Sequence, residues 1–163
     1  MDKKFEVGSW VVYPAHGVGK IERIENINVN GSSFDFFVVT FAKNSLTLKL
    51  PVNKSQNSGL RQLADKKTLD EAMEILSHKS KKRKSMWSKR AQEYETKINS
   101  GDLLALAQVL RDLYKVGGDV MQSFSERQIY HQARERLVKE MSLVESTSEE
   151  DAIRKVETIL QAA

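Results

Sequence analysis

The pattern of apolar and polar positions changes near residue 65, and the two sides of this point predict different secondary structure. Before it, short apolar runs are separated by turn residues, which is typical of strands. Asn30-Gly31 is a strong hairpin signal, because both residues tolerate a positive φ angle. Pro51 cannot donate to a β ladder, so it ends a strand or marks a sheet edge. The predicted strands cover residues 9–13, 18–29, 34–41 and 46–50.

Beyond this point the apolar residues recur every three or four positions, which indicates amphipathic helices. Gly117-Gly118 is expected to end one of them. Residues that can accept hydrogen bonds from exposed backbone N–H groups mark the expected helix starts. These are the capping boxes Thr68/Glu71 and Ser125/Gln128 and the single caps Asp102 and Ser148.

The two patterns together predict an α+β protein of two domains. Residues 1–65 should form a small, strongly bent β-sheet or barrel of the Tudor or SH3 type. Residues 66–163 should form a compact all-α bundle of about five helices, because each apolar stripe needs a partner to cover it.

Composition does not change the predicted fold, but it limits the chemistry and the cellular compartment that we expect. The 163 residues carry a net charge of +4 and contain no cysteine, which excludes disulfides, cysteine metal sites and thiol catalysis. The first residues lack the apolar core of a signal peptide, and no run approaches the ~20 apolar residues that span a bilayer. We therefore expect a soluble, cytoplasmic protein without membrane contact.

A tryptophan in the most basic segment is the strongest candidate for function. Lys84, Lys89 and Arg90 lie close to Trp87 in the sequence. Positive charge attracts phosphate without reading sequence, and an indole can stack on a base or wedge into a base step. Trp87 also shares a helical face with Tyr94, so the pattern fits a core position equally well.

Catalytic signals are weak. The histidines His16, His78 and His131 share no metal-ligand spacing. Gly17-Val-Gly19 falls short of a nucleotide-binding fingerprint. With no activated nucleophile or acid–base pair in view, we expect a protein that is not an enzyme and needs no metal, cofactor or small-molecule ligand.

The strands at 34–41 and 46–50 could accept an added strand from another protein if either lies at a sheet edge. Lys49 would then lie at the rim, where its charge would steer a partner. The alternative is that Lys49 only protects an edge against aggregation.

Short motifs in matching order cover nearly the whole chain. The first is Phe5-x-Val7-Gly8-x-x-Val11-Val12-Tyr13-Pro14-x-His16-Gly17. The others are Leu50-Pro51-Val52, Gly59-Leu60-Arg61, Trp87-Ser88-x-Arg90, Ser100-Gly101-Asp102 and Val109-x-Arg111-Asp112-Leu113. In combination they resemble the CarD/CdnL family of bacterial transcription regulators.

The resemblance implies a fold and two partners. Family members have a Tudor-like domain, similar to a module of transcription-repair coupling factors, that docks on the RNA polymerase β subunit largely by strand pairing. Their helical domain meets promoter DNA at the upstream edge of the transcription bubble, where a tryptophan wedge from the minor-groove side stabilises the open complex. The protein would thus be nucleoid-associated through polymerase.

The resemblance also assigns roles to single positions and favours a DNA-facing tryptophan. The DNA-binding candidates are Trp87, Lys89, Arg90 and Arg127, with Lys84 added from the basic run. The polymerase-binding candidates are Val39, Phe41, Lys49 and Pro51. Ile27 stands where some members carry an arginine, so a polymerase contact from that arginine is absent or replaced.

Two other functions fit the residues. A standalone nucleic-acid-binding protein would bind tightly without polymerase and with a steep salt dependence. A structural adaptor would bury Trp87 and leave the basic segment in solvent.

Overall fold

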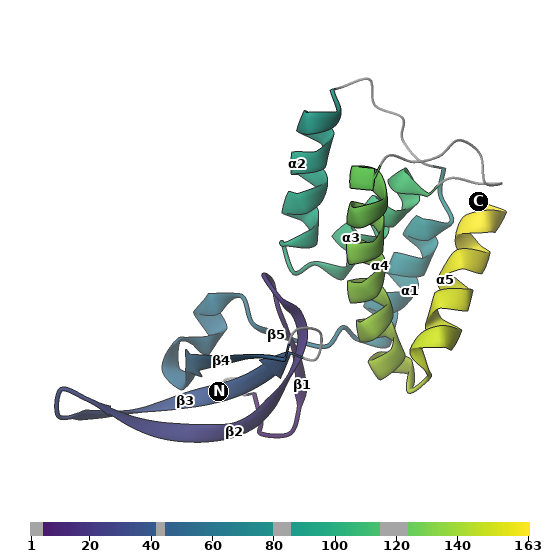
Figure 1. The fold of residues 1–163 in the computed structure, drawn as a ribbon. Coiled ribbons are helices and arrows are strands. Elements are labelled where there is room, and N and C mark those ends of the chain that lie inside the picture. Colours follow the sequence, from purple (N-terminus) through teal and green to yellow (C-terminus); the bar gives the residue numbers. More distant parts are fainter. Residues whose placement is uncertain (1–4, 42–44, 80–85, 115–123) are drawn as a thin grey trace. The chain divides into compact units, whose positions relative to one another are not determined.

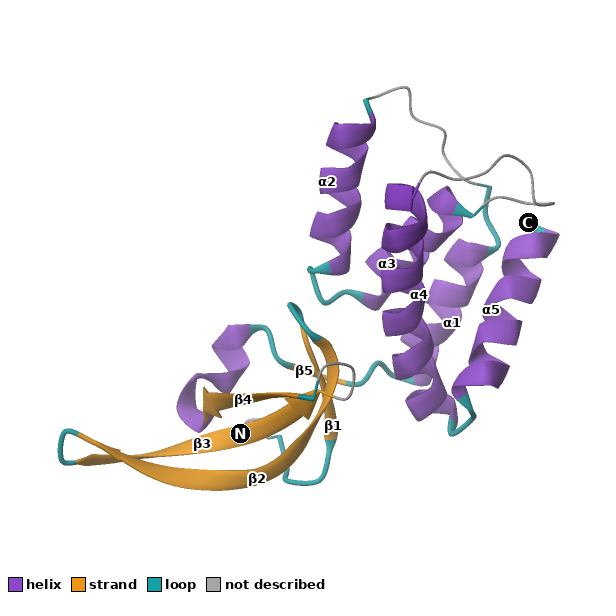
Figure 2. Ribbon diagram, viewed as in Figure 1, coloured by secondary structure: helices purple, strands orange, loops and turns teal. Residues whose placement is uncertain are grey.

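The chain contains two compact units, residues 1–63 and 64–163. The computed structural model describes residues 5–41, 45–79, 86–114 and 124–163, and Figures 1 and 2 show strands in the first unit and helices in the second. The elements of the first unit are β1 (Trp10–Tyr13), β2 (Gly17–Val29), β3 (Ser32–Phe41), β4 (Leu46–Pro51), the 3₁₀ helix η1 (Val52–Ser58) and β5 (Arg61–Gln62).

The five strands form one antiparallel sheet in the order β4-β3-β2-β1-β5. The predicted hairpin joins β2 to β3, with φ angles of 51° at Asn30 and 84° at Gly31. Pro51 ends β4, which lies at an edge of the sheet, as its missing N–H group predicts. The predicted strands and the α+β class are confirmed.

The hairpin of β2 and β3 is longer than its neighbours. β1 pairs with β2 only over residues 17–20, and β4 pairs with β3 over residues 36–41. Residues 26–29 and 32–35 therefore form a two-stranded ribbon, visible at the far end of the hairpin in Figure 1.

One face of the sheet carries the core of this unit: Val11, Ile21, Phe37, Val39, Phe41 and Leu60. Gly19 lies beneath this core, where an added Cβ would be 2.7 Å from ring atoms of Phe41. Close packing between β2 and β3 therefore accounts for the second glycine of Gly17-Val-Gly19.

All regular secondary structure in the described ranges of the second unit is helical. Its elements are α1 (Lys66–Leu76), α2 (Trp87–Ile98), α3 (Leu103–Leu113), α4 (Phe124–Glu145) and α5 (Glu149–Ala162). The predicted stripes face one core, with 0 % exposure at residues such as Leu69, Leu110, Leu137 and Val156. Two predicted caps are confirmed, because Asp102 accepts from the N–H of Leu104 at 3.0 Å and Ser148 accepts from that of Asp151 at 3.0 Å.

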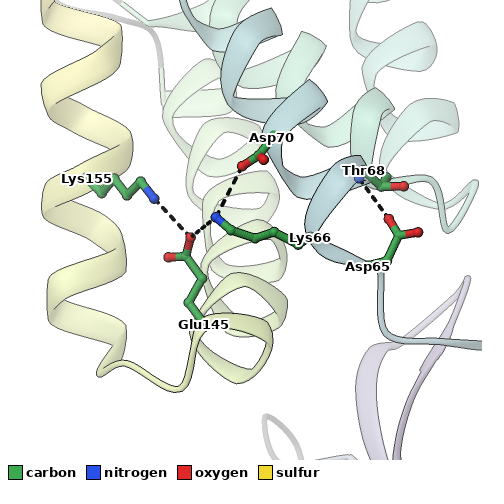
Figure 3. Close-up of polar contacts among 6 residues, drawn as sticks. All are labelled: Asp65, Lys66, Thr68, Asp70, Glu145 and Lys155. Carbon is green, nitrogen blue, oxygen red and sulfur yellow. Dashed lines mark hydrogen bonds and ion pairs between the residues drawn. The ribbon is translucent and has the colours of Figure 1, made fainter.

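The predicted capping boxes are wrong. α1 begins two residues before Thr68, and the carboxylate of Asp65 accepts a hydrogen bond from the N–H of Thr68 at 2.8 Å (Figure 3). Ser125 lies inside α4, which already begins at Phe124. The predicted stop at residues 117–118 lies outside the described ranges.

Ion pairs connect three helices of this unit. The carboxylate of Glu145, at the end of α4, lies 2.9 Å from the ammonium of Lys155 on α5 and 3.7 Å from that of Lys66 on α1 (Figure 3). Lys66 also lies 3.3 Å from Asp70. Deeper in the unit, Glu140 is 1 % exposed and accepts a hydrogen bond from the N–H of Ala64 at 2.7 Å, which anchors the chain at the start of this unit.

Candidate functional site

Trp87 is the first residue of α2. Met86 has the extended backbone of a helix cap, and its carbonyl accepts hydrogen bonds from the N–H groups of Lys89 and Arg90, both at 3.1 Å. No side chain caps this end. Trp87 therefore lies in the first turn of α2, and this turn is at one end of the helical unit (Figure 1).

The indole is half-buried and makes contacts on more than one side. It packs against the helical core, its ring centroid lies 6.1 Å from that of Tyr94, and the guanidinium carbon of Arg90 lies 5.1 Å from the ring centroid. A guanidinium at this distance stabilises an aromatic ring and is held in place by it. Trp87 is thus neither fully exposed nor fully buried. Its burial lies between the exposed, DNA-facing position and the core position that the sequence left open.

The other basic candidates divide between α2 and α4. Lys89 and Arg127 are exposed, and Arg90 is half-buried. A hydrogen bond of 2.9 Å from Arg136 on α4 to the carbonyl of Ile98 holds the two helices together near the end of α2. Both helices begin at the same end of the unit (Figure 1), so Arg127, in the first turn of α4, belongs to the end that carries Trp87. Lys84 lies outside the described residues.

Two exposed apolar residues at these helix starts were missed by the sequence reasoning. Met86 is 76 % exposed and Phe124 is 67 % exposed. Met86 directly precedes α2, and Phe124 begins α4. The sequence signal that could identify them is an apolar residue that lies outside the apolar stripe of its helix. The end of the unit thus combines cationic and apolar groups, the composition that suits contact with phosphates and exposed bases.

The polymerase-binding candidates do not share one surface. Val39 is 0 % exposed and Phe41 is 1 % exposed, and both lie in the core on β3, which has β2 on one side and β4 on the other. Their side chains are therefore not exposed for direct contact with a partner, and their assignment to polymerase binding stays a prediction. The sequence could not reveal this, because β3 is apolar on both faces and the strand order is a tertiary property.

Lys49 and Pro51 lie on β4, one of the two outer strands of the described sheet. The side chain of Lys49 is 49 % exposed, and its ammonium lies 3.1 Å from the carboxylate of Glu25 on β2. Arg23 donates a hydrogen bond to the other oxygen of that carboxylate at 2.8 Å. The hydrogen bonds from Arg23 and then from Lys49 hold the pKa of Glu25 below its ordinary value.

The described residues show no cluster of three or more histidine, aspartate or glutamate side chains able to hold a metal ion. His16 stacks on Tyr13, with ring centroids 5.8 Å apart, and lies 5.4 Å from the ring of Phe41, so packing explains it. None of the helices within the described ranges is long and apolar enough to cross a bilayer.

Comparison with known proteins matches both units. Residues 5–64 match the family described as CarD-like/TRCF RID domain, and residues 71–157 match CarD, C-terminal domain. The chain is 28 % identical over 145 residues to the Bacillus subtilis (strain 168) protein named "Putative transcription factor YdeB", covering 89 % of this chain and 95 % of that protein. The chain therefore belongs to the CarD family of transcription regulators.

Proposed function

We propose that this protein stabilises the open promoter complex, with its two parts acting on different partners. The N-terminal domain, residues 1–65, docks on the β subunit of bacterial RNA polymerase. The helical domain, residues 66–163, contacts promoter DNA at the upstream edge of the bubble. The observation that carries the proposal is that α2, whose first turn holds Lys89 and the Trp87–Arg90 stack, and α4, whose first turn holds Arg127, begin at the same end of the helical unit (Figure 1).

The physical argument on the DNA side rests on stacking. Melting a base step costs roughly 1–2 kcal/mol, and an aromatic ring that stacks on an exposed base returns roughly 1–3 kcal/mol. One contact by Trp87 would therefore shift a near-balanced opening equilibrium about tenfold. Arg90 stacks on the ring, and Lys89 and Arg127 would add affinity for phosphate without reading sequence.

The argument on the polymerase side rests on the edge of the sheet. β4 is the outer strand next to β3, so its free backbone groups can pair with an added strand. Lys49 supplies charge beside that edge, while Val39 and Phe41 contribute by holding β3 and β4 in place. Attachment to polymerase raises the local concentration of the DNA-contacting end, so the protein needs no operator of its own.

Separate variants test the two roles. Lys49→Glu places a negative charge beside the β4 edge and should strongly reduce capture of the β subunit in a pull-down. Trp87→Ala should leave that capture at the wild-type level. If instead both variants are captured as well as the wild type, β4 is not the docking edge. If the protein binds duplex DNA tightly without polymerase and with a steep salt dependence, it acts alone.

A further inference from the structure

Lys49 lies on the sheet face opposite the core of the N-terminal unit. The register pairs Arg23 with Val38 and Val38 with Lys49, and directly paired residues share a face. Glu25 is two residues along β2 from Arg23 and therefore points to the same side. Arg23, Glu25 and Lys49 thus form one charged cluster across β2, β3 and β4.

The ion pair directs Lys49 away from the free edge of β4. Its ammonium lies 3.1 Å from an oxygen of Glu25 on β2, and β3 separates these two strands. Neighbouring strands are about 4.8 Å apart, so the side chain reaches across β3 toward the interior of the sheet. A strand added at the edge of β4 would lie on the opposite side of Lys49.

We propose that Glu25 is a specificity-determining residue that competes with the polymerase for Lys49. This inference rests on the proposed docking at β4. On docking, the ammonium of Lys49 leaves Glu25 and pairs with a carboxylate that the added strand places beside it. If the partner strand has no acidic residue at that position, Lys49 stays paired with Glu25 and adds nothing to the affinity for that partner.

Arg23 lowers the free-energy cost of moving Lys49 from Glu25 to the polymerase. Arg23 and Lys49 bind different oxygens of the Glu25 carboxylate, so Glu25 keeps its partner on β2 after Lys49 has left. Both groups are also accessible to water, with 59 % of the Arg23 side chain and 28 % of the Glu25 side chain exposed. Water can therefore replace the lost contact.

The test measures binding of the full-length protein to purified core RNA polymerase. Glu25→Gln removes the competing charge and should tighten binding about two- to fivefold, the range that exposed ion pairs support. Glu22→Gln is the matched control, because it removes the same charge from an exposed residue of β2 that does not pair with Lys49. It should leave the affinity unchanged.

The same measurement in a Lys49→Gln background separates this inference from the proposed function. Lys49→Gln alone should weaken binding, and adding Glu25→Gln should then have no further effect. If Lys49→Gln weakens binding but Glu25→Gln does not tighten it in the wild-type background, the competition is refuted and docking at β4 stands. Equal tightening by Glu25→Gln and Glu22→Gln would also refute it. If Lys49→Gln has no effect, the proposed docking contact fails as well.

Discussion

At the scale of single residues, Trp87 serves the fold and the candidate site at once. Its ring packs on the helical core and against Tyr94, and the guanidinium of Arg90 stacks on it. Removing the ring therefore removes buried surface together with any contact to DNA. A loss of activity in Trp87→Ala is informative only when the stability of the variant is known.

We predict that Trp87→Ala lowers the free energy of unfolding by about 1–2 kcal/mol, less than the ~3–5 kcal/mol typical of a fully buried aromatic ring. Trp87→Phe, which keeps an aromatic ring against Tyr94, should lose less than Trp87→Ala. Urea denaturation followed by circular dichroism measures both. A loss above about 3 kcal/mol for Trp87→Ala would show that the residue is mainly a core residue.

Tyr130 offers a second prediction at this scale. Its hydroxyl is buried and has no hydrogen-bond partner among the described residues, and burial raises the pKa of Tyr130 to about 12. Because an unpaired buried hydroxyl costs free energy, Tyr130→Phe should leave stability unchanged or raise it by up to about 1 kcal/mol. Thermal unfolding at neutral pH tests this, and a clear loss of stability would mean that the hydroxyl has a partner.

The sign of the pH dependence of Tyr130 is fixed by its raised pKa. The hydroxyl ionises more readily in the unfolded chain, so its titration leaves stability unchanged below about pH 10 and lowers it as the pH rises toward 12. Tyr130→Phe should reduce this alkaline loss of stability.

At the scale of elements, helix starts were predictable where the signal was local. Asp102 and Ser148 cap their helices as expected, because each accepts a hydrogen bond from a residue two or three positions ahead. The start of α1 was missed because two acceptable caps, Asp65 and Thr68, compete over one turn. The carboxylate of Asp65 is a stronger hydrogen-bond acceptor than the hydroxyl of Thr68. It accepts the hydrogen bond from the N–H of Thr68 and so caps the helix.

We predict that Asp65→Ala lowers the melting temperature at pH 7. The hydrogen bond from the Thr68 backbone holds the pKa of Asp65 below its ordinary value. A carboxyl whose pKa is depressed by folding stabilises above its unfolded pKa, and this contribution is lost as the pH falls through its folded pKa. The difference between wild type and variant should therefore narrow below about pH 4. A difference that is constant across this range would show that Asp65 does not act through its charge.

Packing between β2 and β3 gives a further prediction at this scale. Any side chain at position 19 would overlap the ring of Phe41, with Val39 2.9 Å from the added Cβ. Gly19→Ala should therefore lower stability by about 1–3 kcal/mol, the usual cost of overpacking. Gly31→Ala provides a contrast, since an added Cβ there meets nothing within 4 Å and its cost reflects a positive φ of 84°, a conformation that Gly19 does not have. Urea denaturation compares the two, and an unchanged Gly19→Ala would show that Phe41 can move.

At the scale of the whole molecule, the two-part architecture is predictable from the sequence, but the neighbours of the candidate functional residues are not. The change from strand to helix periodicity near residue 65 is a local signal and was read correctly. The pairing of Lys49 with Glu25 and the interior position of β3 depend on residues far apart in the chain. No periodicity encodes such contacts.

The lifetime of the open promoter complex tests the central claim most directly, since stabilisation of that complex is the activity proposed for the whole molecule. Open complexes formed with saturating wild-type protein and challenged with a DNA competitor should persist longer than those formed with polymerase alone. Trp87→Ala, folded at the assay temperature and still bound to polymerase, should lose most of that extension, a change of up to about tenfold. If this variant extends the lifetime as much as the wild type does, Trp87 is not the wedge and the account is contradicted.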